Sequence, residues 1–238
     1  MVSVVIHTNL GLGNQFECAR WLEDGFAKHG IKAEITPDKH KAADVHVVQG
    51  PWYCLDYWRP RSMDSRVLWL NRGFWGDARE DLSIGWLRPD GSRNFNNDGA
   101  AEGNGFYPQP QPRKTKGRCA IVFADYGRDP SEDVERAKRE YNSVFFRPHP
   151  QQPIETKAVT LQGPLDVCWH WGDVAIGHSS TVLVEARIEG LRVESSDPLH
   201  VVHAHPDDDE RWLRELSWGM WHYTQIQRGD FWEHLRDC

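Results

Sequence analysis

Residues 173–193 read DVAIGHSSTVLVEARIEGLRV, and this stretch decides the fold expected for the C-terminal half of the chain. Val174–Ile176 is a short apolar run typical of a buried strand, and residues 177–181 form a turn of small polar residues. Residues 182–189 predict a helix that ends at Gly190, and Val193 begins another strand. A strand, a turn, a helix and a strand in this order predict two parallel strands of an α/β fold.

The same alternation runs through the rest of the chain. Apolar runs predict strands, and residues with a spacing near 3.6 predict helices between them. The expected strands are 2–7, 32–36, 45–49, 67–71, 119–124, 143–146 and 159–161. The expected helices are 15–29, with Gly30 as its C-cap, 131–141, with Ser131 as its N-cap, and a short one at 165–171.

A boundary between two α/β units is expected near the middle of the chain. Residues 82–111 are rich in Gly, Asn and Pro and predict loops, and residues 108–118 resemble an interdomain linker. The expected domains are therefore 1–112 and 113–238, two small Rossmann-like domains with parallel sheets that face a central cleft. The C-terminal helices could pack back on the first of them.

Composition narrows the class of protein further. The chain has 238 residues, a formal net charge of −7, and no apolar run of membrane-spanning length. Its N-terminus is predicted to be a strand and not a signal peptide, and its five cysteines are scattered without a CxxC pair. We therefore expect a cytoplasmic α/β protein that is not a basic nucleic-acid-binding module.

The turn at 177–181 is the first candidate site. The N-terminus of the predicted helix offers free N–H groups and a positive dipole end, and Ser179, Ser180 and Thr181 add hydroxyl groups that could bind a phosphate. Glu185, one turn further on, could accept hydrogen bonds from the two hydroxyls of a ribose. The alternative is that Ser and Thr only cap the helix and that Glu185 is solvated.

Two side chains at the end of another strand favour the phosphate site. Arg147 and His149, in the sequence Arg147-Pro148-His149-Pro150, follow the predicted strand 143–146. Open parallel sheets bind ligands at the carboxyl ends of their strands. Arg147 and His149 are therefore expected beside the same ligand, with a surface loop as the alternative for His149.

Together these motifs resemble the C-terminal domain of GT-B glycosyltransferases, closest to the capsule-polysaccharide and glycerophosphate-transferase branches. Residues 71–75 resemble a strand end of the capsule group, and residues 216–235 resemble the tail of glycosyltransferase-like proteins encoded by bacteriophages. The resemblance implies a nucleotide-diphosphate sugar as co-substrate and neither a metal nor another cofactor. It implies that Arg147 and His149 flank the donor, and that Glu185 holds its ribose. It implies that the turn holds the phosphates, through His178, Ser179, Ser180 and Thr181.

Loops of the first half could line the cleft. Gly11, Gly13, Asn14 and Gln15 follow the first strand, but the third glycine of a dinucleotide-binding fingerprint is absent, which excludes an NAD site, and no P-loop is present. We expect Asn14 or Gln15, with Arg72, to touch the ligand. Asp77 and Asp98 are the candidates for a catalytic base, with plain turn residues as the alternative. Asp207–Asp209 are expected at a solvated helix start.

The acceptor is expected to be phage DNA with 5-hydroxymethylated pyrimidines, in the cytoplasm of a host cell. Arg59 and Arg61 could bind phosphates there, while Trp52 and Trp58 could stack on a flipped base. Two alternatives stay open: a polysaccharide acceptor of the capsule type, and a protein that binds nucleotide sugars without catalysis.

Overall fold

The structure, a computed structural model, consists of two units that each have their own sheet and core. It describes residues 2–8, 13–49, 55–76, 79–95, 107–114, 117–152 and 154–237, without the side chains of 13, 14, 55 and 56. The first unit is Met1–Tyr107 with Leu213–Cys238, and the second unit is Pro108–Trp212. The expected division after residue 112 differs from this one at the C-terminal end, since Leu213–Cys238 belongs with the N-terminal half.

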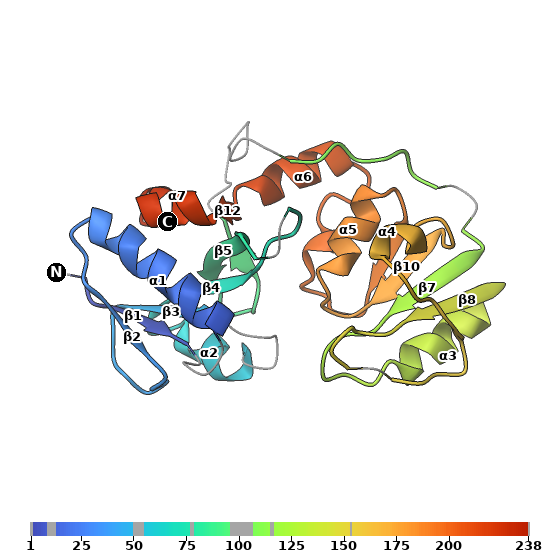
Figure 1. Cartoon of the computed structure of the whole chain (residues 1–238), viewed down its shortest axis with the longest axis horizontal. Coiled ribbons are helices and arrows are strands. Elements are labelled where there is room, and N and C mark those ends of the chain that lie inside the picture. The colour runs from blue at the N-terminus through green and yellow to red at the C-terminus, as the bar shows by residue number, and fades with distance from the viewer. Residues whose placement is uncertain are drawn as a thin grey trace. The chain divides into compact units, whose positions relative to one another are not determined.

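The second unit is built on five parallel strands in the order β11-β10-β7-β8-β9 (Figure 1). They are β7 Cys119–Phe123, β8 Ser143–Arg147, β9 Val159–Thr160, β10 Val174–Gly177 and β11 Arg192–Ser195. Strand order reverses between β7 and β10, because the chain moves outward from β7 through β8 to β9 and then returns to β10. This is the strand order of a Rossmann sheet, in which ligands bind at the reversal.

Helices cover both faces of this sheet. On α3 (Ser131–Glu140), Val134 and Ala137 share a core cluster with Ile176 of β10. The next residue, Gly177, presents its other face to Leu183 of α5 (Val182–Ile188), at 3.3 Å from an ideal Cβ. Since alternate residues of a strand face opposite sides, α3 and α5 lie on opposite faces of the sheet.

The remaining elements of the second unit are short. They are α4 Leu165–Cys168, the 3-10 helix η2 Val201–His203 and the beginning of α6 (Asp209–Ser217).

The expected N-cap at Ser131 is wrong: Ser131 is already helical, and its backbone N–H donates to Asp129 Oδ1 at 2.9 Å. Gly190 does end α5, with φ +79°, a conformation that glycine adopts without strain.

The first unit has a mixed sheet in the order β12-β5-β4-β3-β1-β2, with β6 paired to β5. β1 to β4 are mutually parallel and reverse their order between β1 and β3. β5 pairs antiparallel with β4, and both β6 and β12 pair antiparallel with β5. The strands are β1 Val4–His7, β2 Ala33–Thr36, β3 Val45–Gln49, β4 Arg66–Arg72, β5 Asp81–Leu87, β6 Arg93–Asn94 and β12 Met220–His222. The helices are α1 Gly13–Lys28, α2 Leu55–Arg61, α7 Tyr223–Arg228 and α8 Asp230–Leu235.

Two features of the first unit differ from expectation. Part of the expected loop region 82–111 is a buried strand, since Leu82, Ile84 and Trp86 of β5 lie in the core. β5 is antiparallel to β4, and its other edge pairs with β12, which is more than a hundred residues away in sequence. This long-range pairing stabilises β5, although the sequence of β5 contains a glycine and predicts a strand only weakly.

Close packing joins the C-terminal helices to α1. Gly25 of α1 leaves no room for a side chain, since a Cβ there would lie 2.1 Å from the Ile226 carbonyl oxygen of α7. Phe26 packs against Phe231 and Trp232 of α8, at ring distances of 5.2 and 5.0 Å. At the end of α1 the N–H groups of Gly30 and Ile31 donate to the Ala27 and Phe26 carbonyls, which confirms Gly30 as the C-cap.

Within the described residues, none of the helices combines the length and the apolar character needed to cross a membrane.

Candidate functional site

The candidate site lies at the carboxyl edge of the second unit's sheet, where strand order reverses between β7 and β10. Asp125 follows β7, and the turn 177–181 follows β10 and leads into α5. Asp125 Oδ2 accepts the backbone N–H groups of His178 at 2.8 Å and Ser179 at 3.3 Å. A single carboxylate therefore ties together the two strand ends that flank the reversal.

Asp125 is a residue that the sequence reasoning missed. It is 6% exposed, and burial raises the pKa of its carboxyl group, while the two backbone hydrogen bonds act in the opposite direction. Its sequence signal was present, because it directly follows a buried strand, as Arg147 does. Its position has a consequence for the expected phosphate site: the N–H groups of His178 and Ser179 already have an anionic acceptor.

Other residues of the turn are held by hydrogen bonds within the unit. Ser180 Oγ accepts the N–H of Val182 at 3.4 Å, and the Ser180 carbonyl pairs with His200 Nε2 at 3.2 Å. His178 Nδ1 lies 3.0 Å from Ser196 Oγ. Thr181 is the N-cap residue of α5 but makes no side-chain capping bond. The turn is thus partly a capping structure, through Ser180, whereas Thr181 makes no side-chain capping bond.

Glu185 differs from an ordinary helix carboxylate. It is half-buried, and among the described residues its carboxyl group has neither a hydrogen-bond nor an ion-pair partner. Desolvation by burial, with the nearby charge of Glu189, raises the pKa of Glu185 to about 7. Because the Glu185 side chain is half-buried, the alternative of a solvated helix residue does not fit. A half-buried carboxyl without a partner is suited to accept or donate hydrogen bonds to a ligand.

Arg147 and His149 lie at the end of β8, beside the end of β7. The Arg147 guanidinium donates to the carbonyl of Leu161 at 3.1 Å and to that of Gly163 at 2.5 Å, so part of its donor capacity holds the loop after β9. His149 Nδ1 accepts the N–H of Gln151 at 3.2 Å, which assigns the proton of the neutral ring to Nε2. The His149 ring packs edge-to-face against Tyr126, with centroids 5.4 Å apart.

The structure brings most of the predicted donor residues to one edge of one sheet. His178, Ser179, Ser180 and Thr181 follow β10, and Glu185 lies in the first turn of α5. Arg147 ends β8, the next strand but one from β10, and His149 lies two residues further on. Their roles toward a ligand stay predictions. In the described part of the chain, no group of three or more His, Cys, Asp or Glu side chains could hold a metal ion.

The predicted residues of the first half are distributed differently. Trp58 is 4% exposed and packs on the rings of His7 and His46, whose Nε2 and Nδ1 atoms are 2.9 Å apart. Burial and the neighbouring His46 lower the pKa of His7 to about 4. The prediction that Trp58 stacks on a base therefore does not fit, because its indole is part of the core.

The other acceptor and cleft candidates lie on separate elements. Arg61 covers the Tyr57 ring, with its Cζ 3.5 Å from the ring centroid, and Arg59 is exposed on α2. Arg72 is exposed at the carboxyl end of β4, and Gln15 lies in the first turn of α1. Gly13 and Asn14 also begin α1, without described side chains. The remaining candidate residues, Gly11, Trp52, Asp77 and Asp98, lie outside the described residues.

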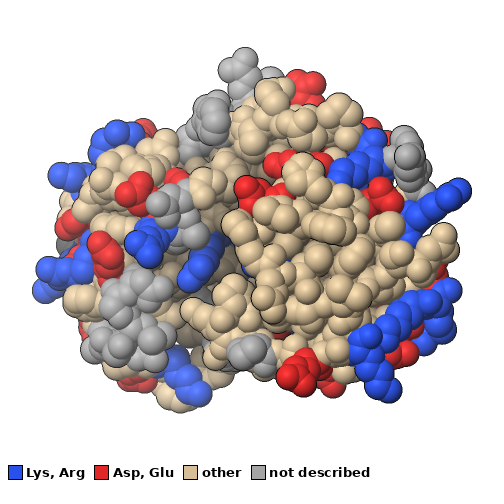
Figure 2. Space-filling model, turned by 45° about the vertical axis from the view of Figure 1, so that its right-hand side comes forward, with Lys and Arg blue, Asp and Glu red and all other residues tan. Residues whose placement is uncertain are grey.

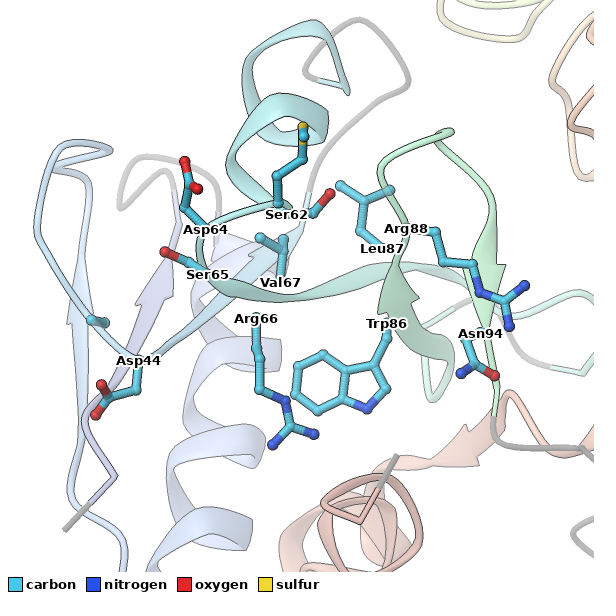
Figure 3. A pocket seen from close by; sticks show the side chains of 12 residues that line it. Asp44, Ser62, Asp64, Ser65, Arg66, Val67, Trp86, Leu87, Arg88 and Asn94 are labelled. Carbon is cyan, nitrogen blue, oxygen red and sulfur yellow. The ribbon is translucent and has the colours of Figure 1, made fainter.

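A surface pocket of about 460 Å³ occurs elsewhere in the first unit (Figure 3). It lies at the start of β4, the edge opposite the one at which Arg72 ends that strand. Arg66 and Trp86 lie side by side in it, with the Arg66 Cζ 4.2 Å from the ring centroid, and Arg66 also donates to the Arg236 carbonyl at 3.0 Å. Because Arg66 is engaged within the protein, this pocket is a weaker candidate than the edge of the second sheet.

Comparison with known proteins supports the fold. No protein-family model matches the chain, and no curated protein has a matching sequence. Among solved structures, the chain is similar to Thermosulfurimonas dismutans KpsC, a beta Kdo 2,7 transferase, with a TM-score of 0.52 and 14% identity over 92% of this chain and 90% of that one. The beta Kdo 2,4 transferase of the same organism has a TM-score of 0.48 and 12% identity over the same shares of both chains. At 14% identity, the first of these likenesses describes a shared fold.

Proposed function

We propose that this protein is a glycosyltransferase that moves a sugar from a nucleotide sugar to a hydroxyl group of a saccharide acceptor. The observation that supports it is the arrangement at the carboxyl edge of the second sheet. Glu185, a half-buried carboxyl without a hydrogen-bond or ion-pair partner among the described residues, lies one helical turn beyond a turn that carries Ser and Thr hydroxyl groups. The fold shared with a Kdo transferase supports the proposal of a glycosyltransferase.

In this proposal each part of the donor meets a group of matching chemistry. Glu185 accepts hydrogen bonds from the ribose hydroxyls, which favour its charged form and lower its raised pKa on binding. Thr181 and Ser180 contact the phosphate. Arg147 and His149 add a positive charge and a ring N–H at the end of β8, two strands away from β10. These cationic and dipolar groups stabilise the leaving phosphate without requiring a metal.

Transfer forms a bond between the acceptor oxygen and the anomeric carbon of the sugar while the bond from that carbon to the phosphate oxygen breaks. The electron pair of the broken bond goes to the leaving phosphate, and the acceptor proton goes to a base. Asp77 and Asp98 stay the candidates for that base.

The acceptor in this proposal is a saccharide and not DNA. Trp58, one of the two aromatic residues expected to stack on a base, is buried, and the chain carries a net charge of −7. Figure 2 shows Lys and Arg side chains intermixed with Asp and Glu over the face that it displays. A saccharide needs hydrogen-bonding groups more than a basic surface, whereas duplex DNA binding depends on many cationic contacts.

The test is a transfer assay on the purified protein. A mixture of nucleotide sugars is offered with an oligosaccharide pool and, separately, with duplex DNA that contains 5-hydroxymethylpyrimidines, and products are weighed by mass spectrometry. A sugar increment on an oligosaccharide is the expected result, lost in Glu185→Ala and kept in the surface control Glu132→Gln. An increment on DNA would replace the acceptor, and binding of the donor without any transfer would indicate a non-catalytic nucleotide-sugar-binding protein.

A further inference from the structure

An exposed aromatic residue stands beside the candidate site and has no role in the fold's core. Tyr126 directly follows Asp125 at the strand reversal and is 49% exposed. The Tyr126 ring packs edge-to-face against the His149 ring, with the ring centroids 5.4 Å apart and an interplanar angle of 64°. The exposed part of this ring contributes little to folding, and at the carboxyl edge of a parallel sheet it is suited to contact with a ligand.

The two loops that carry this aromatic pair are tied to each other. The N–H of Gly127 donates to Gln152 Oε1 at 2.5 Å, and the N–H of Gln152 donates to the His149 carbonyl at 3.0 Å. Pro148 and Pro150 restrict the backbone on both sides of His149. Asp125 is held by its bonds to the turn after β10. The Tyr126 ring therefore belongs to a preorganised surface, which reduces the entropy that a ligand contact would cost.

The order of strands indicates which part of a nucleotide sugar reaches this surface. The phosphate of such a molecule lies between the nucleoside and the sugar. With the phosphate at the turn after β10 and the ribose at Glu185 on α5, the nucleoside lies toward β11, because α5 packs on β10 and on the edge strand β11. The sugar then extends the other way, over the ends of β7 and β8, where Tyr126 and His149 lie.

We propose that Tyr126 is the platform on which the transferred sugar stacks, and that it sets the preference for a pyranose with an apolar C–H face; this rests on the proposed function. The electron-rich face of the ring attracts the weakly positive C–H groups of a pyranose. His149 buttresses the ring at its edge. Tyr126 is thus a specificity-determining residue and takes no part in bond breaking.

The test separates the sugar from the nucleotide by isothermal titration calorimetry. Wild type and Tyr126→Ala are titrated with each member of a panel of nucleotide sugars and with the corresponding nucleotides alone. Tyr126→Ala should weaken binding of the nucleotide sugar by roughly 2- to 12-fold and leave binding of the nucleotide alone unchanged, and Tyr126→Phe should restore the wild-type value. Trp171→Ala is the matched control, since Trp171 is 54% exposed but precedes β10 at the opposite edge of the sheet.

Each of the other outcomes refutes either the sugar platform or the proposed function. An equal loss of affinity for both ligands in Tyr126→Ala would assign Tyr126 to the nucleobase. Unchanged affinity for both ligands would show that Tyr126 lies outside the site. Both results refute the sugar platform and leave the proposed function standing. If wild type binds neither ligand, the proposed function fails and the platform fails with it. Glu185→Ala should weaken binding of both ligands. This effect would show that the donor site exists even where the results for Tyr126 refute the sugar platform.

Discussion

At the scale of single residues, the unusual ionisation of Glu185 is the property that connects the site with stability. Its ordinary pKa of 4.5 is raised to about 7, chiefly by burial. Between these values the folded protein holds more protons than the unfolded chain, so Glu185 lowers the free energy of unfolding as pH rises from about 4.5 to about 7. Above that range the cost is constant, and below it the cost disappears.

Glu185→Gln should therefore stabilise the protein at pH 8, by on the order of 1–3 kcal/mol, and have little effect at pH 4. Urea unfolding at the two pH values measures the difference. Glu132→Gln on the exposed surface of α3 is the control and should change neither value. An equal shift at both pH values for Glu185→Gln would mean that packing, and not ionisation, causes it.

At the scale of elements, one carboxylate holds the segment that follows β11 against α5. Asp209, at the start of α6, accepts Arg187 Nε at 2.8 Å and two donors of Arg113, also at 2.8 Å. Arg187 is 5% exposed, donates to the carbonyls of Val202 and Ala204, and lies 4.0 Å from the Trp212 ring centroid. The expectation of a solvated helix start is thus wrong for Asp209, although α6 does begin there, with Asp208 Oδ1 accepting the Arg211 N–H at 2.9 Å.

Asp209→Ala should lower the free energy of unfolding by about 3–5 kcal/mol, because it leaves the buried Arg187 charge without its carboxylate. Asp207→Ala is the matched control two residues away: the Asp207 side chain is 97% exposed, and its loss should cost about 0–1 kcal/mol. Chemical denaturation of both variants tests this. Similar losses in the two would contradict a stabilising role for the ion pair between Asp209 and the buried Arg187.

At the scale of the whole molecule, the first unit is completed by the last residues of the chain. β12 extends its sheet, and α7 and α8 cover α1. Gly25→Ala tests this assembly, since alanine favours helix but here would force α1 from α7. It should destabilise the first unit by about 1–3 kcal/mol, whereas Lys28→Ala, exposed on the same helix, should be neutral or slightly stabilising.

Amide hydrogen exchange measures the effect of Gly25→Ala separately in the two units. Amides of α1, β1 and α7 should lose protection in Gly25→Ala, while those of β7 and β10 keep theirs, because the two units have separate cores. Unchanged protection in α1 would show that α7 moves aside without cost, and it would contradict the close packing.

The sequence by itself determined the local elements of this protein. The apolar runs and the glycines at 30 and 190 predicted most strands and helices of both sheets, and the turn 177–181 with Glu185 marked the edge that carries the candidate site. Those features depend on residues close together in the chain, where side-chain periodicity and backbone conformation act directly.

Tertiary structure alone decided the remainder, because it depends on residues that are distant in sequence. The pairing of β12 with β5, the union of Asp125 with the turn after β10, and the burial of Trp58 against two histidines each join segments whose partners no local pattern specifies. The free energy of such contacts comes from burying shared apolar surface and satisfying buried polar groups, and both are properties of the packed molecule.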